Sequence, residues 1–431
     1  MKKQEVSLFW FRRDLRLEDN VGLFFALKSE FPVIPLFIFD TDILDSLPSN
    51  DARVGFIHDS LSDINAKLQR ITSSLLIKKG RTQEVWRGLI DEFDVKEVFF
   101  NKDYEPYAIK RDLAICELLE INKTKTFLHK DQVIFEETEI TKADGLPYTV
   151  YTPFKNKWLE KYKSLAPVLE YDSTSLFSNF YKNTFAFPTL LEIGFKENSI
   201  KVQPHNLTKV SNYHETRDFP AVDSTSYLSP HLRFGTVSIR KLVNWAAHKN
   251  DVFLSELIWR EFFMQILFSF PNVVTHNFKS AYDGIQWHNN VDDFQRWCSG
   301  TTGYPMVDAG MRQLNETGYM HNRVRMVVAS FLCKHLLIQW QWGEAYFAEK
   351  LLDYELSANV GNWQWAAGTG CDAAPYFRVF NPEIQLKKFD EKGIYIRKWI
   401  PEFDLGYGLP MVEHAFARDR AIATYKAGIA K

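Results

Sequence analysis

Cysteine is scarce in this sequence, and long apolar runs are absent. Its four cysteines, Cys116, Cys298, Cys333 and Cys371, have neither CxxC spacing nor the density of a disulfide framework. We therefore expect a reducing compartment and a chain without structural disulfides or a metal site. No apolar run approaches the roughly 18 residues that cross a bilayer, and Arg12 and Arg13 come before a signal-peptide core could form. We expect a cytoplasmic protein with no membrane partner.

A surplus of charge of one sign is lacking too. The 52 lysines and arginines and the 54 aspartates and glutamates give a formal net charge of −2. General affinity for polyanions is therefore not expected, and any nucleic-acid binding needs a local basic face. The dinucleotide fingerprint G-x-G-x-x-G is also missing, which argues against a nicotinamide cofactor held in the usual way.

Alternating strand and helix patterns fill the first third of the chain. Short apolar runs predict strands at Ser7–Phe11, Val33–Phe39, Leu75–Ile77, Glu97–Asn101 and Thr126–Leu128. Apolar residues spaced by three and four predict a helix over Asp51–Arg70, with Asp51 as its N-cap. The alternation predicts an α/β domain, residues 4–133, built on a doubly wound parallel sheet. Residues 134–200 are predicted to be a long linker, and residues 201–431 an all-helical domain.

Aromatic residues are plentiful, and they concentrate in the second half of the chain. Seven of the twelve tryptophans lie between Trp259 and Trp365. Trp363 and Trp365 belong to the segment NVGNWQWAAGTGCDAAPYFRVFNP (Asn359–Pro382), which also contains three glycines. Because glycine inside a helix costs roughly 1 kcal/mol relative to alanine, these glycines predict a close approach of the backbone to another backbone or to a ligand. A tightly packed corner of the core is the alternative interpretation.

As an ordered string, this segment resembles the flavin-binding segment of the photolyase/cryptochrome family. Two further segments, WFRRDLRLEDN (Trp10–Asn20) and TVYTPFKNKW (Thr149–Trp158), also resemble that family. The resemblance implies an α/β domain joined by a long linker to an all-helical FAD-binding domain. It leaves room for a second, antenna chromophore in the N-terminal domain. Folate is not expected there, because Tyr107 and Ala108 replace the Asn-Glu pair that grips it in the family.

The resemblance implies FAD as the cofactor and assigns it a set of residues. Hydroxyls and N–H groups at a helix start suit a pyrophosphate, although the run Thr225–Ser229 taken alone is more often an N-cap. A guanidinium, Arg325, is expected to pair with Asp353. The residues expected to bind the cofactor are Tyr213, Thr225, Ser226, Tyr227, Leu228, Ser229, Arg325, Asp353, Tyr354 and Glu355.

On the substrate side, helical spacing places an acid and an aromatic residue on one face. Glu256, Trp259 and Arg260 are at i, i+3 and i+4, a pattern that a plain amphipathic border also produces. The resemblance implies that this acid hydrogen-bonds a flipped-out pyrimidine pair, on which this tryptophan stacks. The full set expected to contact UV-damaged DNA is Arg217, Glu256, Trp259, Arg260, Asn322, Arg323, Met326 and Trp365, with the two arginines Arg217 and Arg323 on phosphates.

Electron transfer is expected to use three tryptophans. Trp287, Trp340 and Trp363 align with the family's chain from the surface to the flavin, although each singly is more often a core residue. Asn359 falls where the family places the residue facing flavin N5, although an asparagine before Val360-Gly361 also suits a helix end. A neutral amide is a poorer proton donor than an acid, which favours a repair enzyme. The expected catalytic residues are Glu256, Trp287, Trp340, Trp363 and Asn359.

The resemblance thus predicts a light-dependent DNA repair enzyme, a class I cyclobutane pyrimidine dimer photolyase. We expect a monomer with no obligate protein partner. The alternatives are a blue-light photoreceptor (a cryptochrome) and a (6-4) photoproduct photolyase. Asn359 and the absence of a tail after Lys431 argue against the photoreceptor. Asn322 and Met326 stand where (6-4) enzymes carry histidines, whereas the pair Gly361-Asn362 resembles the animal-type branch.

Overall fold

The structure is a computed structural model that describes residues 3–430 of the 431. Its residues form two compact units that alternate along the chain. The first unit extends to Glu139 and includes Leu159–Pro204 and Leu228–His248; the second consists of Ile140–Trp158, His205–Tyr227 and the chain from Lys249 onwards. The predicted domain boundaries at residues 133 and 200 divide the chain only twice, and they stay a prediction.

The first unit is built on a parallel sheet. Its strands are β1 (Glu5–Phe11), β2 (Val33–Asp40), β3 (Leu76–Gly80), β4 (Asp94–Asn101) and β5 (Lys125–His129). They lie in the order β3-β2-β1-β4-β5, and every neighbouring pair is parallel. This order, in which the chain winds outward from β1 in both directions, confirms the predicted doubly wound sheet.

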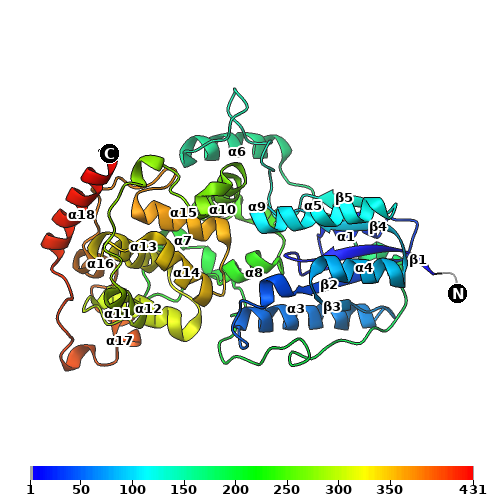
Figure 1. The fold of residues 1–431 in the computed structure, drawn as a ribbon, viewed down its shortest axis with the longest axis horizontal. Helices are drawn as coiled ribbons and strands as arrows, with labels where there is room; N and C mark the ends of the chain where they lie inside the picture. Colours follow the sequence, from blue (N-terminus) through cyan, green and yellow to red (C-terminus); the bar gives the residue numbers. More distant parts are fainter. Residues whose placement is uncertain (1–2, 431) are drawn as a thin grey trace. The chain divides into compact units, whose positions relative to one another are not determined.

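Helices cover both faces of this sheet (Figure 1). The helices of the first unit are α1 (Val21–Ala26), α2 (Thr41–Leu44), α3 (Ala52–Gln69), α4 (Thr82–Glu92), α5 (Pro106–Ile121), α8 (Leu228–Phe234) and α9 (Ile239–Ala246), with the short turn η1 (Thr174–Asn179). Alternate β1 residues point to opposite faces, so that Trp10 packs with Trp86 of α4 and Phe11 shares a cluster with Leu61 of α3. The predicted N-cap of α3 is confirmed, because the Asp51 carboxylate accepts a hydrogen bond from the Arg53 N–H at 2.9 Å.

A buried network of charges joins three separate segments of the first unit. Asp131 accepts hydrogen bonds from Arg16 at 2.7 and 2.8 Å and from Arg240 of α9 at 2.8 Å. Arg240 also donates to both carboxylate oxygens of Asp19 at 3.1 Å. Burial by itself raises the pKa of Asp131, but the two guanidinium groups outweigh burial and leave this pKa lowered.

The second unit is helical, as predicted. Its elements are α7 (Tyr213–Thr216), α10 (Asp251–Ser269), α11 (Val291–Ser299), α12 (Pro305–Thr317), α13 (Asn322–Ser330), the π-helical turn η5 (Phe331–His335), α14 (Trp340–Lys350), α15 (Leu356–Ala367), α16 (Pro382–Phe389), α17 (Ile394–Trp399) and α18 (His414–Ile429), with the short turns η2 (Leu207–Val210), η3 (Pro271–Val274), η4 (Ser280–Tyr282) and η6 (Phe403–Leu405). Helix α6 (Tyr151–Leu165) begins in this unit and lies within the segment predicted as a linker. Within residues 3–430, no helix has both the length and the apolar character needed to cross a membrane.

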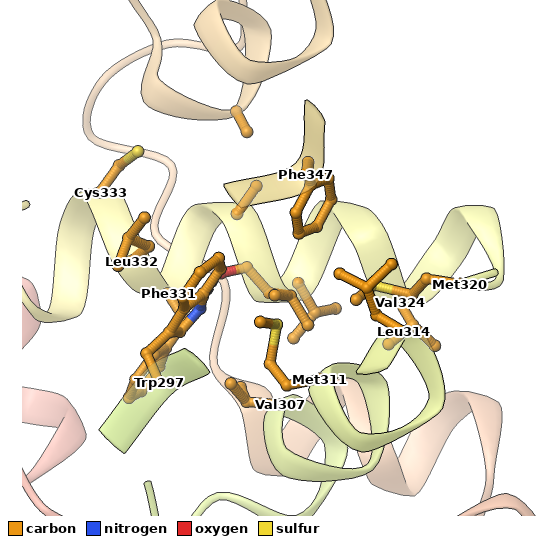
Figure 2. Packing of buried hydrophobic residues seen from close by; sticks show 14 of the residues in the cluster. Trp297, Val307, Met311, Leu314, Met320, Val324, Phe331, Leu332, Cys333 and Phe347 are labelled. Carbon is orange, nitrogen blue, oxygen red and sulfur yellow. Dashed lines mark hydrogen bonds between the residues drawn. The ribbon is translucent and has the colours of Figure 1, made fainter. Parts of the chain in front are cut away.

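The core of the second unit includes the region where helices α11 and α12 meet the turn η5. Trp297, Met311 and Phe331 converge from different elements (Figure 2), and each is fully buried. The indole N–H of Trp297 donates to the Val328 carbonyl at 3.2 Å, so this large side chain is buried without losing its hydrogen bond. Helices α13 and α15, on which predicted site residues lie, pack into this core.

Two glycines of the Asn359–Pro382 segment have clear structural causes. Gly361 lies where α15 meets α10, and a Cβ atom there would come within 2.2 Å of the Phe263 ring. Gly368 ends α15 with φ of 92°, a left-handed conformation that suits glycine. At both positions the glycine is required by the chain's own packing or backbone.

Because Asp131 neutralises two buried guanidinium groups, Asp131→Asn should be strongly destabilising. We expect a loss of about 3–5 kcal/mol in the free energy of unfolding, the usual cost of breaking a buried ion pair. The folded pKa of Asp131 lies below its unfolded value of about 3.9, so its stabilisation is present above that pH and is lost as the pH falls further. Urea denaturation between pH 3 and pH 7 should therefore find a smaller acid sensitivity in the variant.

The matched control is Asp42→Asn, which removes an exposed carboxylate paired with Arg81 at 3.4 Å in the same unit. It should change the unfolding free energy by no more than about 0.5 kcal/mol. Equal effects of the two substitutions would contradict the assigned role of Asp131.

Candidate functional site

The predicted acid and aromatic residues lie together on helix α10. Asn250 caps this helix by accepting a hydrogen bond from the Phe253 N–H at 3.0 Å. Glu256 and Trp259 are both partly exposed, although most of α10 is buried. Helix α10 packs against α15, and α15 packs against α13. The two predicted substrate helices, α10 and α13, therefore both contact the helix that carries Asn359, Trp363 and Trp365.

An aromatic partner fixes the plane of Trp259. The ring of Tyr151 stacks on it with 3.6 Å between centroids and 8° between planes. Tyr151 is itself held by a hydrogen bond from its hydroxyl to the Ser255 carbonyl at 2.7 Å, and burial raises the pKa of its phenol. One face of Trp259 is thus covered by Tyr151, and the centres of the Phe262 and Phe263 rings lie 5.5 and 5.4 Å from that of the indole.

The two arginines predicted to bind phosphate are both in ion pairs. Arg217 donates to Glu256 at 2.7 Å, with about a quarter of each side chain exposed. Arg323 donates to Asp218 through Nη2 at 2.7 Å and through Nε at 3.2 Å. Adjacent residues of opposite charge, Arg217 and Asp218, are therefore paired with two different helices, α10 and α13.

The imidazole next to the predicted lesion pocket serves as a helix cap. His321 precedes α13, and its Nδ1 accepts a hydrogen bond from the Arg323 N–H at 3.2 Å. Burial, joined by the charges of Arg325 and Arg323, lowers the pKa of His321 to about 4, despite an opposing effect of Asp218. The imidazole is therefore neutral at neutral pH. Asn322 and Met326 follow it on α13, and Arg323 Nη1 lies 3.6 Å from the Met326 sulfur.

On the predicted flavin side, the expected pair of Arg325 and Asp353 is present. Arg325 donates to Asp353 Oδ2 at 2.9 Å and to the Met320 carbonyl at 2.8 Å. The other oxygen, Asp353 Oδ1, is buried without a hydrogen-bond partner among the residues that the structure describes. Because a buried unsatisfied acceptor is costly, this oxygen fits a ligand with an N–H or O–H donor, as a flavin ring has.

Glu355 and Asn359 have defined roles in helix α15. Glu355 caps the helix and accepts a hydrogen bond from the Ala358 N–H at 2.8 Å. Asn359 lies inside the helix, so the alternative interpretation of it as a helix end is wrong. Its Nδ2 donates to the Glu344 carbonyl at 3.1 Å and to the Glu344 carboxyl at 2.8 Å. With the amide nitrogen engaged in this way, the amide oxygen is the atom free to face a ligand.

The segment predicted to hold a pyrophosphate directly precedes α8. Tyr227 has φ of 54°, an unusual conformation for a residue with a side chain. Its hydroxyl donates to Asp223 at 3.1 Å, and its ring makes an edge contact with Tyr319. Thr225, Ser226 and Tyr227 belong to the second unit, whereas Leu228 and Ser229 begin α8 in the first. Tyr213 makes an edge contact with Phe253 and lies 5.3 Å from the Arg217 guanidinium. Their role in binding a cofactor stays a prediction.

The three predicted relay tryptophans belong to one helical unit and differ in exposure. Trp363 and Trp340 are buried, whereas Trp287 is partly exposed and contacts Tyr425. The Trp363 ring makes edge contacts with Phe347 at 5.0 Å and with Trp297 at 6.1 Å. The sequence of steps through Trp340 and Trp287 stays a prediction.

Sequence reasoning missed three side chains of this region. They are Tyr151, Asp218 and Glu344, which contact Trp259, Arg323 and Asn359 respectively. Tyr151 falls inside the motif Thr149–Trp158, so an aromatic role could have been sought there. Neither carboxylate has a spacing signal, because its partner lies 105 residues away for Asp218 and 15 for Glu344.

In the first unit, Tyr107 is one of the two residues that replace the Asn-Glu pair by which the family grips folate. Its hydroxyl donates to Asp40 at the end of β2, at 2.7 Å, and burial raises the pKa of the phenol. The expectation against folate stays a prediction.

Comparison with known proteins identifies both units. Residues 7–171 match the family model described as DNA photolyase, and residues 253–405 match that described as the FAD binding domain of DNA photolyase. The deoxyribodipyrimidine photo-lyase of Agrobacterium fabrum is 36% identical over 471 residues, which cover 97% of each chain.

Solved structures agree with this assignment. A bacterial class III photolyase from Agrobacterium tumefaciens has a TM-score of 0.89 and 33% identity, covering 100% of this chain and 99% of that one. An archaeal photolyase from Sulfolobus tokodaii, solved with two FAD molecules, has a TM-score of 0.85 and 34% identity, covering 98% and 100%. Because one of these relatives is named as class III, the expected class I membership stays a prediction. The chain belongs to the DNA photolyase family, and its helical unit contains that family's FAD-binding domain.

Proposed function

We propose that this protein is a deoxyribodipyrimidine photolyase that uses light to split cyclobutane pyrimidine dimers in UV-damaged DNA. The observation that carries the proposal is the set of polar and aromatic groups on two helices that both pack against α15. Glu256 and Trp259 lie on α10, and Asn322 and Met326 follow the capping His321 on α13. The adjacent residues Arg217 and Asp218 pair with Glu256 and with Arg323 of α13. This set offers an aromatic wall and hydrogen-bonding groups for an extruded base pair. It offers no imidazole that titrates near neutral pH, which repair of a (6-4) product would need.

In this proposal each protein group has a limited task. When bound, reduced FAD supplies the electron that opens the dimer after it absorbs light. Arg325 and Asp353 hold the cofactor, with the unpaired Asp353 oxygen as a hydrogen-bond acceptor. Asn359 presents its amide oxygen, fixed by Glu344. Arg217 and Arg323 bind phosphates and set the register of the strand without reading its sequence.

The second candidate is a blue-light photoreceptor, because the fold alone does not determine the function. The neutral amide at Asn359 and the arrangement on α10 favour repair. Illumination of the FAD-loaded protein with damaged DNA separates the two candidates, since a photoreceptor would leave the lesions intact.

Photoreduction should depend on Trp363. If it is the relay residue next to the flavin, Trp363→Phe should block light-driven reduction of oxidised FAD, measured by absorbance. Repair by enzyme reduced with dithionite should persist, because the relay serves only to reduce the cofactor. The control is Trp399→Phe, at a partly buried tryptophan of the same unit, which should photoreduce normally. Photoreduction at the parental rate in Trp363→Phe would contradict the relay. If Trp297→Phe slowed photoreduction and Trp340→Phe did not, the relay would instead pass through Trp297.

Binding to DNA should lose salt dependence when a phosphate contact is removed. Arg217→Gln and Arg323→Gln should each weaken binding to damaged and undamaged duplexes. Each should reduce the log–log salt slope by roughly 0.7–0.9, measured by fluorescence anisotropy at several salt concentrations. Arg397→Gln, at an arginine paired with Asp404, should leave the slope as it is. An unchanged slope in either test variant would remove that arginine from the DNA interface.

The lesion preference should be exclusive. Illumination of two oligonucleotides, one with a cyclobutane dimer and one with a (6-4) product, should reverse only the cyclobutane dimer, as read by chromatography. Glu256→Ala should lower the repair yield without abolishing flavin binding, because the carboxylate contacts the lesion and not the cofactor. Reversal of the (6-4) lesion alone would contradict this preference. The pair Gly361-Asn362 would then indicate the lesion better than Asn322 and Met326 do.

A further inference from the structure

One acidic residue next to the predicted DNA-contacting arginines has no place in the repair reaction. Asp218 follows Arg217 directly, and its Oδ1 accepts both hydrogen bonds from Arg323. About a third of the Asp218 side chain and a fifth of the Arg323 side chain are exposed. The carboxylate therefore lies beside a guanidinium that is accessible to solvent and proposed to bind phosphate.

The local charge at this interface is balanced. Arg217 pairs with Glu256, and Arg323 pairs with Asp218. Two positive and two negative groups give these four residues a formal charge of zero. A phosphate approaching Arg323 also meets the negative charge of Asp218, and the screened attraction between phosphate and guanidinium is partly cancelled.

Asp218 is one of several contacts of Arg323. The guanidinium carbon of Arg323 lies 4.5 Å from the centre of the Phe389 ring, a distance typical of a cation–π contact. Its Nη1 approaches the Met326 sulfur, and its backbone N–H is held by His321. Among these contacts, Asp218 is the one that brings a negative charge to the guanidinium.

We propose that Asp218 is an electrostatic counterweight that limits the affinity of this protein for DNA. The proposal rests on the proposed function, because it assumes that Arg323 binds DNA phosphate. A weaker hold on the strand matters to a repair enzyme, since the repaired duplex must leave before another lesion can bind. Asp218 thus lowers the affinity for DNA and thereby speeds dissociation of the repaired duplex.

Asp218→Asn tests the charge with little change in shape. The amide oxygen of asparagine can still accept hydrogen bonds from Arg323, and exposed ion pairs contribute little to stability, so the variant should fold and bind FAD. We expect binding to damaged and undamaged duplexes to tighten about fivefold at low salt, the ratio that corresponds to about 1 kcal/mol. The log–log salt slope should steepen by up to about 0.9, and the gain should shrink as salt rises.

Catalysis gives an independent readout. The ratio of the multiple-turnover rate to the single-turnover rate should fall in Asp218→Asn, because the product duplex dissociates later. The matched control is Asp404→Asn. Asp404 accepts from Nε and Nη2 of Arg397 at 2.6 and 3.0 Å, in an arrangement like that of Asp218 and Arg323, and this substitution should leave DNA binding unchanged.

Three outcomes would overturn the counterweight. Weaker binding with a shallower slope in Asp218→Asn would make the carboxylate an organiser of Arg323. Unchanged binding in Asp218→Asn would show that this carboxylate does not affect the affinity for DNA. Equal tightening in Asp404→Asn would attribute the effect to the net charge of the protein. Failure of the proposed function is distinguishable, because the parental protein would then leave the cyclobutane dimer unrepaired.

Discussion

The buried carboxylate of Asp131 is the interaction on which the first unit depends. It lies between Arg16, which follows β1, and Arg240 on α9, which is more than a hundred residues away in sequence. A single acid therefore attaches a late helix to the sheet that forms at the start of the chain. Since an unpaired guanidinium cannot be left buried without a large cost, these segments must come together as a set. The discontinuous composition of the unit follows from this constraint.

Charge is used differently in the second unit. There the ion pairs are partly exposed, and they hold Arg217 and Arg323 in place without removing them from solvent. Such pairs contribute little to stability. Their effect is to keep two guanidinium groups accessible at the surface. A chain with a net charge of −2 can therefore have a local site for a polyanion whose strength is set by neighbouring acids.

The fold was largely predictable, because apolar periodicity and short-range capping determine it. The runs that became β1 to β5 and the Asp51 cap are local signals. The site was predictable only where spacing along one helix is enough, as for Glu256 and Trp259. The partners Tyr151 and Asp218 come from distant segments, and only the packing of helices brings them close. Helix α6 lies within the segment predicted as a linker, although its buried residues Tyr151, Phe154, Trp158 and Tyr162 recur every three or four positions. The Thr, Ser, Lys and Pro content of the whole segment outweighed this local helical signal in the prediction.

The contact between Gly361 and Phe263 has a mechanical consequence. With no side chain at Gly361, helices α10 and α15 approach until backbone meets ring, and no flexible group remains between them to absorb a displacement. Trp259 projects from one of these helices, and Asn359 and Trp363 from the other. The missing side chain at Gly361 therefore allows the close contact between the two helices that carry the residues predicted to face the lesion and the flavin. Any side chain at this position would push the Phe263 ring away and separate the helices.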